Sequence, residues 1–420
     1  MTSAATRHLA PARRQLDNGA VVIARQTSTH PAVTFYATLE AGSGFDPDAA
    51  LGLAHFVSRV IDRGTTTLSA DAIADALDGR GISLSTGVTR QSLWFSCTCL
   101  AEDVEAVLNL LADVIRRPSF PADQVELRRG SIVTGIRQDE DNPAAVATEG
   151  LMALIYPDGH PYGRLARGTV SSVESITRDM LVEFHDNHAG PSGLRLVVVG
   201  DCEASHVHDL ADHAFGDWAP TLVGPLDPAH AAPPAGRRYV HRPMPGKPQA
   251  DIAYGYPTIV RADPRYYALT LMNNVLGQYA LGGRLGDNIR ERQGMAYYVF
   301  SSFDANVAEG PLVIRAGVSP ENVDRTVAAI DEEVGRMGRD GITPAELADS
   351  QRYLVGSMPR VLETNAGIAA FLHGAEYFGL GLDFDEQLPQ LLGAVTLDDV
   401  NDVARRFLSP DHASIVVAGP

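Results

Sequence analysis

The feature that most constrains the fold is an internal repeat. The tetrapeptide Thr177–Met180 precedes a predicted helix and is followed by the apolar stretch Leu196–Gly200. The same pair of landmarks returns 219 positions later, as Thr396–Asp399 and Ile415–Gly419. In both places a threonine able to cap a helix precedes a short β-branched run that ends in glycine. Matched landmarks in the same order indicate that the chain contains two copies of one structural unit.

A second pair of landmarks supports the duplication and helps to locate the boundary. An amphipathic helix leads to Phe120–Asp123 in the first half, and another leads to Thr343–Glu346 in the second. Residues 219–236 hold five prolines, which is typical of an exposed linker. We therefore expect an N-terminal domain over residues 1–218, a linker over 219–236 and a C-terminal domain over 237–420.

Length and element content predict the fold class. At 420 residues the chain is longer than a single hydrophobic core normally supports. Each half mixes several predicted strands and helices without strict strand–helix alternation. That arrangement favours α+β layers, in which helices pack on a mainly antiparallel sheet. The sequence therefore predicts an α+β protein of two duplicated domains.

Charge and cysteine content limit the classes of function. A formal net charge of −18 argues against nucleic acid as a ligand. The three cysteines, Cys97, Cys99 and Cys202, have no metal-type spacing, which indicates reduced thiols and a cytoplasmic location. The N-terminal residues lack the apolar core of a secretory signal. No run approaches the length of a membrane span, so we expect no membrane association.

The stretch Gly52–Thr65 has the frame of a zinc-peptidase helix but lacks most of its metal ligands. In the inverted motif H-x-x-E-H, two histidines and a distant third residue bind zinc while the glutamate activates water. His55 takes the first position, but Ser58 replaces the glutamate and Arg59 the second histidine. A guanidinium group has only donors and cannot bind a cation. We therefore expect His55 to be a remnant or a core residue, and no metal in this chain.

These residues, together with His160–Gly163 and Val199–Asp201, resemble the family of pitrilysin, insulinase and the mitochondrial processing peptidase. Active members read Gly-Leu-Ala-His-Phe-Leu-Glu-His. They take their third zinc ligand from a later helix that ends just before an Asp-Asn-Pro-like turn. The equivalent turn here is Asp141–Pro143, so the resemblance places the lost ligand on or beside Gly135. It also implies the fold, two similar α+β halves that face each other like a clam shell.

A second stretch keeps residues that the same family uses. Ile289–Tyr297 resembles the family signature Leu-Arg-Glu-Lys-Arg-Gly-Leu-Ala-Tyr. The resemblance implies that Arg290 and Tyr297 contact the substrate near the zinc. Guanidinium and phenol groups are donors that can stabilise the charge developing on a carbonyl oxygen under attack. From the residues alone, the alternative is a solvated helix end followed by a strand.

In part of the family the site is divided between two chains, one with the metal and one with the arginine and tyrosine. The resemblance therefore identifies this chain as the zinc-less, substrate-binding subunit of a bacterial-type heterodimeric zinc metallopeptidase that cleaves peptides. Its expected partners are a peptide substrate and a homologous subunit that carries an intact H-x-x-E-H motif and the zinc. A homodimer in crystals is compatible with this interpretation.

Two other functions stay open at this point. A chain that keeps the fold and has lost proteolysis would serve as a binding or assembly protein. An active zinc metallopeptidase would require relocated ligands, for which the acidic cluster Asp139–Asp141 beside the lost position is a candidate. The retained Arg290 and Tyr297 favour the subunit of a peptidase complex.

Overall fold

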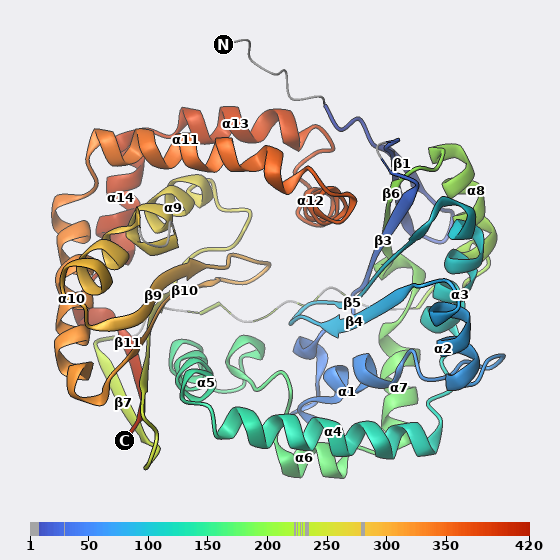
Figure 1. Ribbon diagram of the computed structural model, residues 1–420, viewed down its shortest axis with the longest axis horizontal. Coiled ribbons are helices and arrows are strands. Elements are labelled where there is room, and N and C mark those ends of the chain that lie inside the picture. The colour runs from blue at the N-terminus through green and yellow to red at the C-terminus, as the bar shows by residue number, and fades with distance from the viewer. Residues whose placement is uncertain are drawn as a thin grey trace. The chain divides into compact units, whose positions relative to one another are not determined.

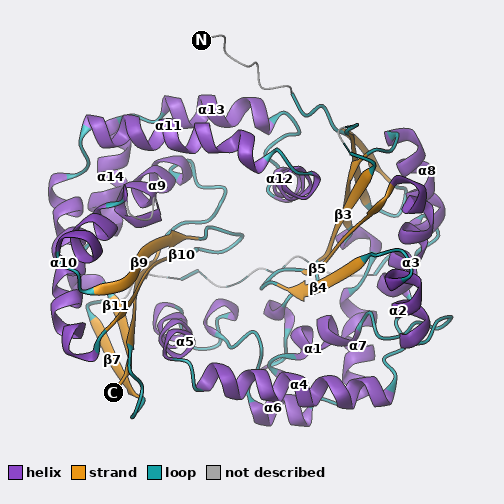
Figure 2. Ribbon diagram, viewed as in Figure 1, coloured by secondary structure: helices purple, strands orange, loops and turns teal. Residues whose placement is uncertain are grey.

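The computed structural model describes residues 8–28, 30–221, 235–278 and 282–420, together with positions 224, 226, 228, 230 and 231. These residues form two compact units, and each unit draws on both halves of the sequence. Unit 1 takes its residues from 1–136, 165–226 and 358–386, and unit 2 from 137–164, 227–357 and 387–420. Each unit combines one sheet with several helices (Figures 1 and 2).

The described residues of unit 1 form a six-stranded sheet in the order β1-β2-β6-β3-β5-β4. Strand β6 pairs in parallel with β2, and the other neighbours are antiparallel. A turn at Asn18-Gly19 joins β1 to β2, and Gly19 has the positive φ of +95° that this turn requires. The strands are β1 (Ala12–Gln15), β2 (Val21–Gln26), β3 (Ala32–Leu39), β4 (Ser83–Val88), β5 (Leu93–Leu100) and β6 (Arg195–Gly200).

One face of this sheet carries the main hydrophobic core of unit 1. Alternate residues of β5, namely Leu93, Phe95, Cys97 and Cys99, are at most 5% exposed. Because side chains alternate along a strand, this period of two places them on one buried face. The helices that contribute to the core are α1 (Leu53–Val60), α2 (Ala70–Asp78), α3 (Val104–Arg116), α4 (Ala122–Glu140), α6 (Val170–Ser175), α7 (Arg178–His188) and α8 (Ala204–Phe215).

The other face of the unit 1 sheet is covered by a helix from the C-terminal half of the sequence. This helix is α12 (Asn365–Tyr377), and it packs along β3 and β6 (Figure 1). Ile368 and Leu372 of α12 are buried in one cluster with Val197 and Val199 of β6. The apolar side chains on the second face of β6 are therefore removed from water by α12.

The described residues of unit 2 repeat the same strand order, without a counterpart of β1. The sheet runs β7-β11-β8-β10-β9, and β11 pairs in parallel with β7 as β6 does with β2. One face of this sheet is covered by α5 (Pro143–Ile155), a helix from the N-terminal half of the sequence. The helix and the sheet are so close that a Cβ added at Gly150 would lie 3.1 Å from the Val416 side chain. The strands are β7 (Arg238–Pro243), β8 (Ala250–Pro257), β9 (Ala296–Phe303), β10 (Pro311–Val318) and β11 (Ser414–Gly419).

Helices on the face of this sheet opposite α5 complete the core of unit 2. They include two π-helical segments, Asn274–Gln278 and Gly286–Arg292, a rare geometry that recurs at functional sites. The α-helices are α9 (Tyr266–Asn273), α10 (Val323–Asp340), α11 (Pro344–Val361), α13 (Phe384–Ala394) and α14 (Leu397–Phe407), of which α11 and α13 continue into unit 1.

The structure confirms the predicted α+β class, with two units of matching strand order. The chain passes from unit 1 to unit 2 after Leu226, inside the predicted linker, whose Pro225, Pro233 and Pro234 lie outside the described residues. The predicted domains were continuous in sequence, whereas the units exchange residues 137–164 and 358–386. Among the described helices, none is both long and apolar enough to cross a bilayer.

A buried carboxylate fixes the start of α1. The Asp46 oxygens accept hydrogen bonds from Gly52 N and Ala54 N, both at 2.8 Å, and Asp46 is 3% exposed. We expect Asp46→Ala to destabilise unit 1 by about 2 to 3 kcal/mol, because both amides lose a charged acceptor. Urea unfolding followed by tryptophan fluorescence measures this effect, since Trp94 and Trp218 both belong to unit 1.

The matched control is Asp179→Ala, in the first turn of α7 of the same unit. The Asp179 side chain is 95% exposed, so its removal is expected to change the free energy of unfolding by less than about 0.5 kcal/mol. Equal effects of the two substitutions would contradict the capping role of Asp46.

Candidate functional site

Helix α1, in unit 1, carries three of the four predicted motif positions. His55 is half-buried, Ser58 is fully buried and Arg59 is exposed. The Ser58 hydroxyl donates to the carbonyl of His55 at 2.7 Å, and Thr86 Oγ1 donates to the carbonyl of Ser58 at 2.6 Å. The predicted position of the catalytic glutamate is thus occupied by a small hydroxyl group that is already bonded to the helix backbone.

Helix α4 lies beside α1 and carries the predicted position of the third ligand. The Arg129 guanidinium lies over the Phe56 ring, 5.1 Å from its centroid, and Thr65 pairs with Pro118 just before α4 begins. A Cβ added at Gly135 would meet nothing within 4 Å. The position therefore has room for a side chain that the sequence does not supply.

The residues at these four positions do not fit a zinc ion. A protein zinc site needs at least three ligands, and here a guanidinium, a bonded hydroxyl and a glycine accompany one histidine. In the part of the chain that the structure describes, no three His, Cys, Asp or Glu side chains gather closely enough to hold a metal. Asp141, from the acidic cluster considered for relocated ligands, is ion-paired with Lys247 at 2.6 Å.

Arg290 and Tyr297 lie in unit 2, where the second π-helical segment gives way to edge strand β9. Gly294 has a φ of +61° and lets the chain reverse between them. Met295 N then donates to Ile289 O at 3.1 Å. Because Ile289 precedes Arg290 and Met295 lies two residues before Tyr297, this bond brings the two segments together.

Tyr297 occupies an irregular position of β9. Its two neighbours in β9 pair with Val318 and Gly317, which leaves Tyr297 as the extra residue of a bulge. The side chain is 61% exposed, and its Oη lies 3.2 Å from Ser319 Oγ. Bulges commonly redirect side chains beside functional sites, and this phenol is accessible to a ligand.

Arg290 is also accessible. Its side chain is 46% exposed, and its contact with Glu291 is long, at 4.0 Å. The neighbouring Arg292, by contrast, pairs with Asp287 at 2.5 Å. The Arg290 guanidinium therefore keeps donors for a planar acceptor such as a carbonyl or carboxylate.

A buried polar group behind the bulge was not predicted from the sequence. Tyr298 Oη donates to Asp251, which is 2% exposed and also accepts from Gln249 Nε2 at 3.0 Å. Burial and the bond to Asp251 raise the pKa of Tyr298, so the phenol stays protonated as a donor. These contacts hold β9 in register beside the bulge. In the sequence, the only sign of this arrangement is the pair of adjacent tyrosines, Tyr297 and Tyr298. The bulge leaves the Tyr297 side chain exposed while Tyr298 binds Asp251.

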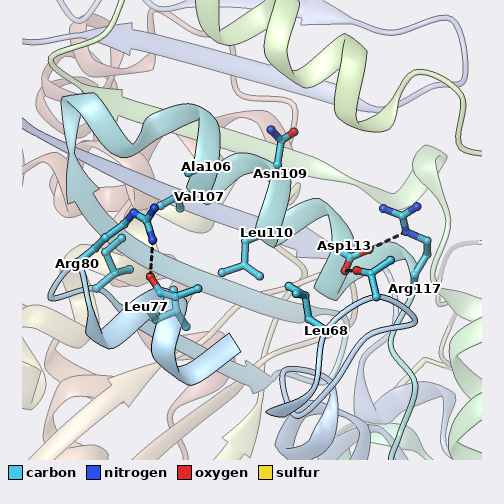
Figure 3. A pocket seen from close by; sticks show the side chains of 12 residues that line it. Leu68, Leu77, Arg80, Ala106, Val107, Asn109, Leu110, Asp113 and Arg117 are labelled. Atoms are coloured by element: carbon cyan, nitrogen blue, oxygen red, sulfur yellow. Dashed lines mark hydrogen bonds and ion pairs between the residues drawn. The ribbon is translucent and has the colours of Figure 1, made fainter. Parts of the chain in front are cut away.

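Unit 1 also contains a hollow of about 390 Å³ between α2 and α3 (Figure 3). Leu77 and Leu110 line its apolar part. Asp113 accepts from Thr67 Oγ1 at 2.7 Å and pairs with Arg117 at 2.7 Å, so these polar groups bind one another. None of the four motif positions, and neither Arg290 nor Tyr297, lines this hollow.

Comparisons with known proteins identify the family. The family model described as insulinase (peptidase family M16) matches residues 21–167, and the one described as peptidase M16 inactive domain matches residues 175–354. The chain belongs to the M16 peptidase family, which confirms the resemblance to insulinase and its relatives.

Individual relatives agree over nearly the whole chain. A Mycobacterium tuberculosis protein named as an uncharacterized zinc protease is 28% identical over 98% of this chain and 94% of its own length. A peptidase M16 inactive domain from Pseudomonas fluorescens has a TM-score of 0.89 at 27% identity, covering 98% of both chains. A Helicobacter pylori protease shares the fold, with a TM-score of 0.89 at 18% identity.

We predict that the purified chain holds no stoichiometric zinc, because Ser58, Arg59 and Gly135 supply no zinc ligand at the other motif positions. Elemental analysis of protein prepared without chelators measures the zinc content. One tightly bound zinc that is lost on His55→Ala would contradict the prediction.

The double variant Arg59→His/Gly135→Glu provides a positive control for the placement of Gly135. It supplies the two missing ligand types while leaving buried Ser58 unchanged, and a Cβ added at Gly135 meets no atom within 4 Å. We expect this variant to bind zinc. A folded double variant without zinc would show that the third ligand position lies elsewhere on α4.

Proposed function

We propose that this protein is the zinc-less, substrate-binding subunit of a heterodimeric zinc metallopeptidase that acts on peptides in the cytoplasm. A homologous subunit with an intact H-x-x-E-H motif would supply the zinc. Membership of the M16 family and the match to its inactive-domain model support this proposal. The motif positions in this chain offer a metal too few ligands, so the chain depends on a partner for hydrolysis.

The observation that carries the proposal is the contrast between the two halves of the divided site. Ser58, Arg59 and Gly135 have replaced the residues that metal chemistry needs. Arg290 and Tyr297 retain the family's residue types, and both side chains are accessible on one reversed segment of unit 2.

The role proposed for Arg290 and Tyr297 is to donate hydrogen bonds to the peptide. A carbonyl oxygen gains negative charge when water attacks its carbon, and donors aimed at it are most effective where water is excluded. The Arg290 fork can bind one planar acceptor through two nitrogens, and the Tyr297 phenol adds a third donor. Both act on charge that forms in the transition state, so their loss should lower kcat more than it raises KM.

We predict that Arg290→Ala or Tyr297→Phe in this subunit lowers turnover by the reconstituted heterodimer on the order of 100-fold. Arg290→Lys should also impair turnover, because a point charge does not replace a planar fork. Steady-state cleavage of a fluorogenic peptide, with the partner subunit unchanged, separates kcat from KM.

Arg292→Ala is the matched control, since Arg292 lies in the same helical segment and its side chain is 72% exposed. Its turnover should stay near that of the unmodified complex. Unchanged turnover for both Arg290→Ala and Tyr297→Phe in an intact complex would contradict the proposal. That result would favour a binding or assembly protein that has kept a peptidase fold.

A further inference from the structure

The degenerate metal site lies beside a cluster of arginines. Arg59 stands at the position of the second histidine, and Arg63 follows four residues later, where Arg63 N still donates to Val60 O at 2.9 Å. Arg128 comes from α4, where the next residue, Arg129, lies over the Phe56 ring of α1. Asp62 is the carboxylate among them and is 8% exposed.

Asp62 does not balance this cluster. Arg63 Nε lies 3.1 Å from Asp62 Oδ1, yet the pair lacks hydrogen-bond geometry. Arg128 Nε is buried, and no acceptor among the described residues bonds to it. Three guanidinium groups thus share one carboxylate, which leaves two positive charges in excess.

The pKa shifts of Asp62 and Arg128 agree with this excess of positive charge. Burial raises the pKa of Asp62, and the charges of Arg63, Arg128 and Arg59 oppose that rise. Burial lowers the pKa of Arg128, and repulsion from Arg63 and Arg59 adds to the effect while Asp62 opposes it. The arginines therefore repel one another and would be stabilised by a further anion.

Two other arginines of unit 1 have a carboxylate partner instead. Arg116 pairs with Asp217 at 2.7 Å, and Arg80 pairs with Asp103 at 2.9 Å. For Arg59 and Arg128, no described carboxylate lies within ion-pair distance. A guanidinium that is partly exposed and lacks a carboxylate partner is well suited to bind one from a ligand.

We propose that Arg59, Arg63 and Arg128 form a carboxylate-binding site at the place where active relatives hold zinc, and that it receives an acidic residue of the bound peptide. In this chain the three guanidinium groups would supply the positive charge that zinc supplies in active relatives. The identity of the ligand as a peptide rests on the proposed function. The binding site itself rests on the arginines.

The test uses the isolated full-length chain and two labelled peptides that differ only in charge. Both are short, blocked at each end and carry the same fluorescent label, one rich in glutamate and the other with glutamine in its place. Fluorescence anisotropy should show tighter binding of the glutamate peptide. Arg59→Gln should weaken that binding by about 10-fold, the loss of one charge-assisted hydrogen bond.

Asp62→Asn gives the decisive second measurement, because it removes the competing carboxylate and should tighten binding of the glutamate peptide. A purely structural cluster would respond to Arg59→Gln and Asp62→Asn in the same direction or not at all. Arg80→Gln is the control, a partly exposed arginine of unit 1 whose loss should leave binding unchanged.

Equal weakening by Arg59→Gln and Arg80→Gln would overturn the proposal, as would weaker binding in a folded Asp62→Asn variant. Equal affinity for the glutamate and glutamine peptides would also overturn it. Because no partner subunit takes part, this result is independent of the turnover measurements on Arg290 and Tyr297. The peptide-binding test can refute the carboxylate site without refuting the proposed function, and the turnover test can refute the proposed function without refuting the carboxylate site.

Discussion

The structure depends on covering the central strands on both faces. Strands β6 and β11 are buried along nearly their whole length, so each needs a helical layer on either side of its sheet. For β6 the second layer is α12, and for β11 it is α5. Burying one leucine or isoleucine in such a layer contributes about 1.5 to 3 kcal/mol, which makes these helices integral to their units. The exchange of segments between units follows from this requirement.

The sequence was sufficient for elements that depend on local signals. Thr177 and Thr396 cap their helices as their positions predicted, and the repeat at 219 positions corresponds to matching strand orders. The sequence was insufficient to predict that the two units exchange segments. The apolar residues of α12 show that this helix is amphipathic, but they do not show which sheet the helix covers. The bulge at Tyr297 was also hidden, since it depends on register between strands.

At the candidate site, too, the sequence predicts what lies along one segment and not what two distant segments form together. The four motif positions and Arg290 with Tyr297 are predictions from a family motif, which can be read along the chain without knowledge of the fold. The electrostatic repulsion between Arg59 and Arg128 was missed because these residues lie on two helices far apart in sequence. A motif therefore predicts where the metal position lies, whereas the arginines around Asp62 are recognised only in the structure. On our proposals, one unit supplies charge for substrate binding and the other supplies donors for the reacting carbonyl.

The central claim, a subunit that binds peptide and depends on a partner's metal, is tested most directly by reconstitution. The chain is mixed with a purified homologue from the same organism that carries an intact H-x-x-E-H motif. Native mass spectrometry then counts subunits and zinc, and peptide cleavage is followed in parallel. We predict one zinc per heterodimer, carried by the homologue, and peptide cleavage only when both subunits are present. Peptide cleavage by this chain without the homologue, at a rate that depends on its own zinc, would contradict this prediction.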